Sequence, residues 1–124
     1  MSTQNAIIIA SVGLDETTSS HINSYINLHR DLEGTNWKYH GNLDPQLTSV
    51  QLINSDEFDI ILLDVDCPLG QRSRYTLTAM NPDLSFIFIA KDPTSVPSGK
   101  VLTRPLIGKD IIKSIAQIVS DIKH

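Results

Sequence analysis

Several features that would assign a protein to a class at once are scarce in this sequence. The single cysteine, Cys67, cannot form a disulfide within the chain, which favours a reducing compartment and therefore the cytoplasm. No apolar run approaches the ~20 residues that span a bilayer, and no basic segment precedes the N-terminal apolar run, so neither a membrane span nor a signal peptide is expected. Lysine and arginine are fewer than aspartate and glutamate, 10 against 14. Direct binding of nucleic acid by this domain is not expected either, because it requires a basic face.

The composition is that of an ordinary globular domain. Hydrophobic residues make up 40% of the 124 residues and charged residues 19%, which excludes a disordered chain. The length suits one domain with its own core, and neither a repeat nor a linker divides the sequence. We therefore expect a single domain over residues 1–124.

Short apolar runs alternate with segments of helical periodicity. The runs predict five strands, at residues 6–12, 36–41, 59–66, 85–90 and 101–103. Helices are predicted from residue 21 to a stop at Gly34, from Pro45 onward, within 71–84 and, most clearly, over the isoleucine stripe at 107–122. Thr18, Ser19 or Ser20 is expected to cap the first helix. This alternation predicts a flavodoxin-like, doubly wound α/β fold, a three-layer sandwich with a five-stranded parallel sheet.

The stretch "FDIILLDVDCPLG" at 58–70 is a buried strand that ends on carboxylates. In parallel sheets, ligands bind outside the carboxyl ends of the strands. The candidate crevice residues at these strand ends are Ala10, Ser11, Asp64, Asp66, Ala90 and Arg104.

A strand-end carboxylate followed by a proline resembles the receiver domain of two-component response regulators. "LLDVDCP" is similar to that family's phosphoacceptor strand, and "TRP" at 103–105 resembles its Lys-Pro motif after the fifth strand. The resemblance spans about residues 6–123. It implies that Asp64 occupies the phosphoacceptor position and that Asp66 lies where a backbone carbonyl helps to ligate Mg²⁺.

The other family positions differ in chemistry. Ala10 and Ser11 stand where the family has its acidic Mg²⁺-binding pair, Ala90 replaces the Thr or Ser, and Arg104 replaces the Lys. Mg²⁺ prefers carboxylates and water as ligands in an octahedron, and phosphoryl transfer depends on the positive charge of this ion. We therefore predict no metal site and no catalytic residues. Rescue of Mg²⁺ binding by Asp15 or Glu16 remains an alternative.

Two further expectations concern the ends of the strands. An arginine fork pairs well with a carboxylate, so an Arg104–Asp64 ion pair is predicted. Between the fourth and fifth strands, residues 91–100 contain two prolines and no apolar periodicity, so the family's fourth helix is expected to be shortened or absent. Standard receiver dimerisation is then not assumed, and a homodimer would use a non-standard face.

The sequence is interpreted as an atypical receiver that is not an enzyme. It is expected to act in bacterial signalling through a protein partner or a fused output domain, as the N-terminal regulatory domain of a longer protein or as a free-standing adaptor. One alternative is a working receiver that is phosphorylated on Asp64 with Mg²⁺. A second is a small-ligand domain in which Arg104 binds an anion in the crevice.

Overall fold

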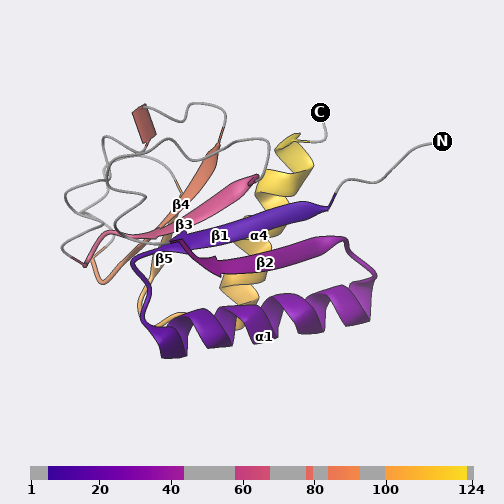
Figure 1. Ribbon diagram of the computed structural model, residues 1–124, viewed down its shortest axis with the longest axis horizontal. Coiled ribbons are helices and arrows are strands. Elements are labelled where there is room, and N and C mark those ends of the chain that lie inside the picture. Colours follow the sequence, from indigo (N-terminus) through magenta and orange to yellow (C-terminus); the bar gives the residue numbers. More distant parts are fainter. Residues whose placement is uncertain (1–5, 44–57, 68–77, 80–83, 93–99, 123–124) are drawn as a thin grey trace.

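Five parallel strands form the centre of the molecule (Figure 1). The computed structural model describes residues 6–43, 58–67, 78–79, 84–92 and 100–122. The strands are β1 (Ile7–Val12), β2 (Trp37–Asn42), β3 (Ile60–Asp64), β4 (Ser85–Ala90) and β5 (Lys100–Thr103), in the spatial order β2-β1-β3-β4-β5. The order reverses between β1 and β3, and this point is where such sheets bind ligands. The predicted fold class and all five strands are confirmed, each to within two residues at either end.

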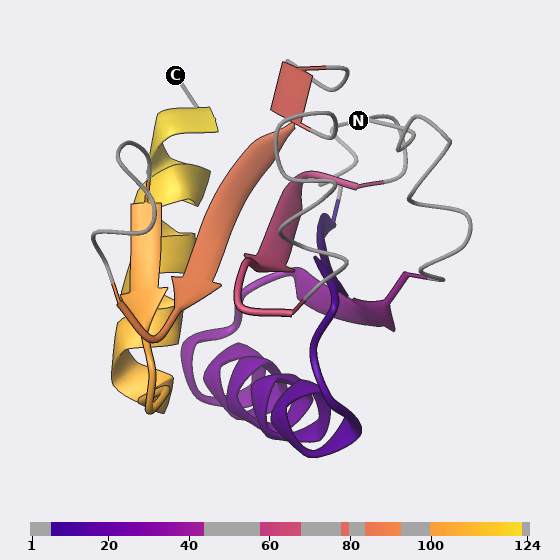
Figure 2. The same cartoon turned by 90° about the vertical axis from the view of Figure 1, so that its left-hand side faces the viewer.

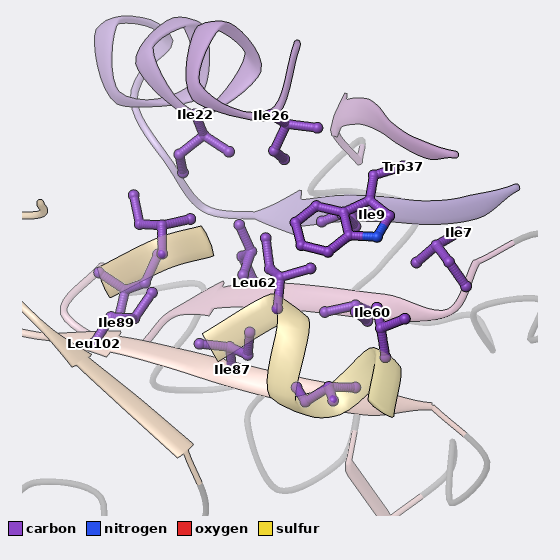
Figure 3. Packing of buried hydrophobic residues seen from close by; sticks show 14 of the residues in the cluster. Ile7, Ile9, Ile22, Ile26, Trp37, Ile60, Leu62, Ile87, Ile89 and Leu102 are labelled. Atoms are coloured by element: carbon purple, nitrogen blue, oxygen red, sulfur yellow. The ribbon is translucent and has the colours of Figure 1, made fainter. Parts of the chain in front are cut away.

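Two helices pack on one face of the sheet. They are α1 (Glu16–Glu33) and α4 (Gly108–Ile122), and Figure 2 shows both on the same side of the strands. Ile22 and Ile26 of α1 point toward the sheet residues Ile9 and Leu62 (Figure 3). Full burial of each such side chain stabilises the fold by about 1.5–3 kcal/mol. The opposite face of the sheet carries a second buried cluster, which includes Val12, Ile61, Leu63 and Phe88.

The start of α1 differs from the prediction. The helix begins at Glu16, and Asp15 caps it by accepting a hydrogen bond from the Thr18 backbone N–H at 2.7 Å. The predicted caps, Thr18, Ser19 and Ser20, lie inside the helix, because a carboxylate one turn earlier already satisfies the free N–H. The predicted stop is correct, since Gly34 ends α1 in the left-handed conformation.

Four large apolar residues within the predicted helices are exposed: Tyr25, Leu28, Leu32 and Ile107. Leu32 of α1 is 72% exposed, and Ile107 is 57% exposed and precedes α4. The carbonyl of Ile107 accepts hydrogen bonds from the N–H groups of Asp110 and Ile111, so this residue lies at the helix entrance.

Several predicted segments fall outside the described residues. These are the helix after Pro45, the 71–84 helix apart from residues 78–79 and 84, and the shortened fourth helix, which would lie at 93–99. Within the part of the chain that the structure describes, no helix is long and apolar enough to cross a membrane.

Candidate functional site

Asp64 is the last residue of β3 and lies buried at the edge of the sheet where the parallel strands have their carboxyl ends. It is one of two polar residues among the buried, described residues, and its side chain is 7% exposed. One carboxylate oxygen, Oδ1, accepts a hydrogen bond from the Asp66 N–H at 2.8 Å. The chain thus turns tightly after β3 and leaves the other oxygen, Oδ2, for a partner from another strand.

That partner is Arg104, which follows β5. The Arg104 N–H donates to the Ala90 carbonyl at 3.0 Å, and this bond extends the pairing of β4 with β5 and places the arginine at the sheet's edge. Its guanidinium then forms an ion pair with Asp64 Oδ2 through Nη2. The predicted ion pair is therefore present. An arginine fork suits this role because one planar group reaches two acceptors.

The guanidinium also forms an ion pair with a second carboxylate, that of Asp66, which was not predicted as a partner of Arg104. Arg104 Nε lies 3.4 Å from Asp66 Oδ2. The same Asp66 oxygen accepts a hydrogen bond at 2.8 Å from the N–H of Lys91, directly after β4. The two aspartates and Arg104, which we call the arginine clamp, therefore tie together the ends of β3, β4 and β5.

Ser11 belongs to a different set of contacts. It is fully buried, and its hydroxyl donates to Asn42 Oδ1 at 2.6 Å. Because that donation uses its only proton, the Tyr39 hydroxyl, 2.7 Å away, donates to Ser11 Oγ. Ser19 Oγ of α1 lies 2.7 Å from the same Tyr39 oxygen and donates to it in turn. Ser11 therefore fastens β1 to β2 and α1.

The register of β1 and β2 explains this orientation of Ser11. Ile9 pairs with Tyr39, whereas Ala10 pairs with Gly41, so His40 is an extra residue on β2. This bulge brings Asn42 opposite Ser11. Gly41, which has φ +107° and lies directly at the bulge, is the sequence signal that could have indicated it.

The two alanines at the predicted crevice lie in the second buried cluster. Ala10 and Ala90 are both fully buried there among apolar side chains. Of the six predicted crevice residues, the structure therefore brings together Asp64, Asp66 and Arg104 as interacting side chains.

Gly13 connects the first strand to this site. Its φ is +83°, and a Cβ there would lie 2.5 Å from Cys67 Sγ and 3.7 Å from Asp64 Cβ. Only glycine adopts this positive φ without strain and also leaves room for the Cys67 thiol. The loop after β1 is therefore pressed against the loop after β3, and the Cys67 thiol donates to the Asp64 carbonyl at 3.3 Å.

Asp15 and Glu16, the candidates for rescuing metal binding, are placed elsewhere. Asp15 caps α1, and hydrogen bonding by the Thr18 side chain and backbone lowers the pKa of Asp15, with a smaller lowering from the charge of Arg104. Glu16 lines a groove between α1 and β2 whose lining does not include Asp64.

These contacts do not fit the Mg²⁺ that the resemblance implies. Magnesium needs several oxygen ligands around it, usually with one or two carboxylates. Among the described residues, no group of three or more His, Cys, Asp and Glu side chains could hold a metal ion. The outward carboxylate oxygens of Asp64 and Asp66 face a guanidinium, which already supplies a positive charge. The two carboxylates and the guanidinium therefore form an internal ion pair and not a metal site.

Comparison with known proteins gives likenesses of fold. No family model and no curated protein matches the sequence. The structure is similar to a response regulator receiver protein from Sinorhizobium medicae, with TM-score 0.68 and 14% identity over 93% of this chain and 95% of that chain. A CheY-like response regulator from Mesorhizobium loti gives TM-score 0.69 and 14% identity over 92% and 99%.

A third similar structure is a protein assigned to pilus assembly in Burkholderia thailandensis. Its TM-score is 0.69, with 15% identity over 92% of this chain and 98% of that chain. These likenesses and the strand order β2-β1-β3-β4-β5 lead to one conclusion. The chain has the fold of a response-regulator receiver domain.

Proposed function

We propose that this domain is a pseudo-receiver, a signalling module that acts through protein–protein contacts and is not switched by Mg²⁺-dependent phosphorylation of Asp64. The arginine clamp is the observation that carries the proposal. In an acyl-phosphate site, the carboxylate must be free to attack and a cation must neutralise the transferred group. Here the nucleophilic position is already paired with Arg104.

The rest of the crevice supports the same proposal. The Ser11 hydroxyl is committed to Asn42 and Tyr39, and so does not face a ligand. Ala90 lacks a hydroxyl that could bind a phosphoryl oxygen. The domain would then transmit a signal by binding a protein partner or by its attachment to an output domain, and it would have no enzymatic activity of its own. A reducing compartment such as the cytoplasm suits a chain with one cysteine.

Intact-mass spectrometry after incubation with Mg²⁺ and acetyl phosphate tests the proposal. We expect no phosphoryl adduct, and no Mg²⁺-dependent change with beryllofluoride in an NMR spectrum. A phosphorylatable receiver treated in parallel shows that the reagents work. The Asp64→Asn variant is the matched control for the site. A phosphoryl adduct on the wild type that is missing from Asp64→Asn would overturn the proposal and establish a working receiver.

The anion-binding alternative is less well supported, because Arg104 already contacts two carboxylates. Thermal-shift measurements with phosphate, sulfate and nucleotides address it. Stabilisation by one of these anions that disappears in Arg104→Gln would favour a ligand-binding crevice over the pseudo-receiver.

A further inference from the structure

A cleft lies between the first turns of α1 and the loop that joins β5 to α4. Its volume is about 270 Å³, which equals that of roughly nine water molecules. Two fully buried side chains, Ile22 and Ile111, close its bottom. The rest of its lining is at least partly accessible and consists of Thr18, His21, Tyr25, Arg104, Pro105 and Leu106. We call this cavity the α1–α4 cleft. Its size suits a compound with a single ring.

The accessible apolar surface of the cleft comes from both of its sides. Tyr25 contributes its ring from α1, and Pro105 and Leu106 contribute from the loop before α4. Gly108 approaches Tyr25 so closely that a Cβ there would lie 2.7 Å from the ring. The ring is therefore held in place by the start of α4. A fixed aromatic side chain beside apolar residues suits a flat, apolar ligand body.

Arg104 gives the cleft a hydrogen-bond donor. One edge of its guanidinium, with Nε and Nη2, faces Asp66 and Asp64 in the arginine clamp. Among the described residues, no hydrogen bond or ion pair uses Nη1, which is on the opposite edge of this planar group. Because Arg104 also lines the cleft, Nη1 is the donor that it offers there. A ligand can accept from it without displacing either aspartate.

Thr18 gives the cleft an acceptor. Its hydroxyl donates a hydrogen bond to Asp15, and this bond is the largest reason why the pKa of Asp15 is lowered. A hydroxyl has a single proton, so the Thr18 oxygen can only accept a hydrogen bond from a ligand. The cleft therefore presents one donor and one acceptor. A carboxamide carries the complementary pair, a carbonyl oxygen and an N–H.

The charges around Arg104 disfavour an anionic ligand. The guanidinium faces the carboxylates of Asp64 and Asp66, and its charge also acts on the carboxylate of Asp15. Three carboxylates near one guanidinium leave an excess of negative charge, which repels a further carboxylate. An uncharged acceptor avoids this repulsion.

We propose that the α1–α4 cleft binds a small, uncharged ring compound through a carboxamide. The carbonyl oxygen accepts from Arg104, an amide N–H donates to Thr18, and the ring packs against Tyr25 and Leu106. In a pseudo-receiver, such a ligand would be a chemical input that replaces phosphorylation. The binding itself does not depend on that proposal, because Asp64 does not line the cleft. A phosphoryl adduct on Asp64 would overturn the pseudo-receiver and leave the ligand site standing.

Three probes of nearly equal size test this chemistry by NMR titration of the backbone amide signals. Benzamide carries both the acceptor and the donor, acetophenone carries the acceptor alone, and benzoate carries a charged acceptor. We expect benzamide to shift the signals of Tyr25 and Leu106 with a Kd on the order of 1 mM, as is usual for so small a ligand. Acetophenone should bind about threefold or more weakly, because it lacks the hydrogen bond to Thr18. Benzoate should bind about tenfold or more weakly, because it also meets the negative charge.

Thr18→Val tests the amide contact, since it removes the hydroxyl and keeps the shape of the side chain. It should lower the affinity for benzamide to that for acetophenone and leave the affinity for acetophenone unchanged. Thr17→Val is the matched control, because it makes the same replacement at an exposed position that does not line the cleft, and it should alter neither affinity.

Three results would overturn the proposal. The first is that benzamide at about 20 mM shifts no signals of the cleft residues. The second is that acetophenone or benzoate binds as tightly as benzamide, which would leave the amide without a role. The third is a preference for benzamide that survives Thr18→Val, because the amide would then not be bound by Thr18.

Discussion

Replacing Asp64 by asparagine tests the arginine clamp directly. The substitution keeps the shape of the side chain and the acceptor for the Asp66 N–H, but it turns an amide or an uncharged oxygen toward Arg104. Breaking a fully buried ion pair by changing one partner costs about 3–5 kcal/mol. Here the Asp64 side chain is 7% exposed and that of Arg104 is 26% exposed, and Arg104 keeps its contact with Asp66. We therefore expect about 2 kcal/mol of destabilisation.

Urea unfolding, followed by the fluorescence of the buried Trp37, measures this change. For a domain of this size, a loss of about 2 kcal/mol also lowers Tm by about 8 °C. Asp66→Asn is the matched control. Its side chain is 31% exposed and lies 3.4 Å from the guanidinium, so its loss of charge should cost less than about 1 kcal/mol. If Asp64→Asn costs no more than Asp66→Asn, the clamp does not stabilise the fold as described.

Two further predictions concern the loop between β1 and α1. Gly13→Ala should destabilise the domain by about 1–3 kcal/mol in the same urea assay, because of the positive φ and the contact with Cys67; an unchanged midpoint would show that the loop moves away at little cost. The lowered pKa of Asp15 means that its capping contribution is complete above its ordinary value of 3.8 and is lost as the pH falls through the lower folded value. The difference in urea midpoint between wild type and Asp15→Ala should thus be constant above about pH 5 and shrink below about pH 4; a difference that grows in acid would contradict this assignment.

Elements defined by local composition could be predicted from the sequence. The apolar runs of β1, β3 and β4 are continuous and short, so their extent and burial follow from pattern alone. The Arg104–Asp64 ion pair could also be predicted, because β3 and β5 run in the same direction and end at the same edge of a parallel sheet.

The contacts that depend on register could not be predicted. The bulge on β2 brings Asn42 opposite Ser11; Gly41 inside the strand is a signal for a bulge, but it does not specify which residue then faces Ser11. The second contact of Arg104, with Asp66, depends on how tightly the chain turns after β3. Asp15 was considered as a metal ligand, although an aspartate followed by Glu16 in a first helical turn also indicates an N-cap. The family resemblance, with its acidic Mg²⁺-binding pair, suggested a metal ligand at Asp15 instead of this N-cap.

The buried hydroxyl network of Ser11 bears on how this domain can evolve. An acidic residue introduced at that position would bury a carboxylate between Tyr39 and Asn42, where the serine is fully enclosed. A lysine introduced in place of Arg104 would give up the contact that one guanidinium makes with two aspartates. Each single substitution toward the acidic residue and the lysine that a phosphorylatable receiver has at these positions is thus penalised by the packing that surrounds it.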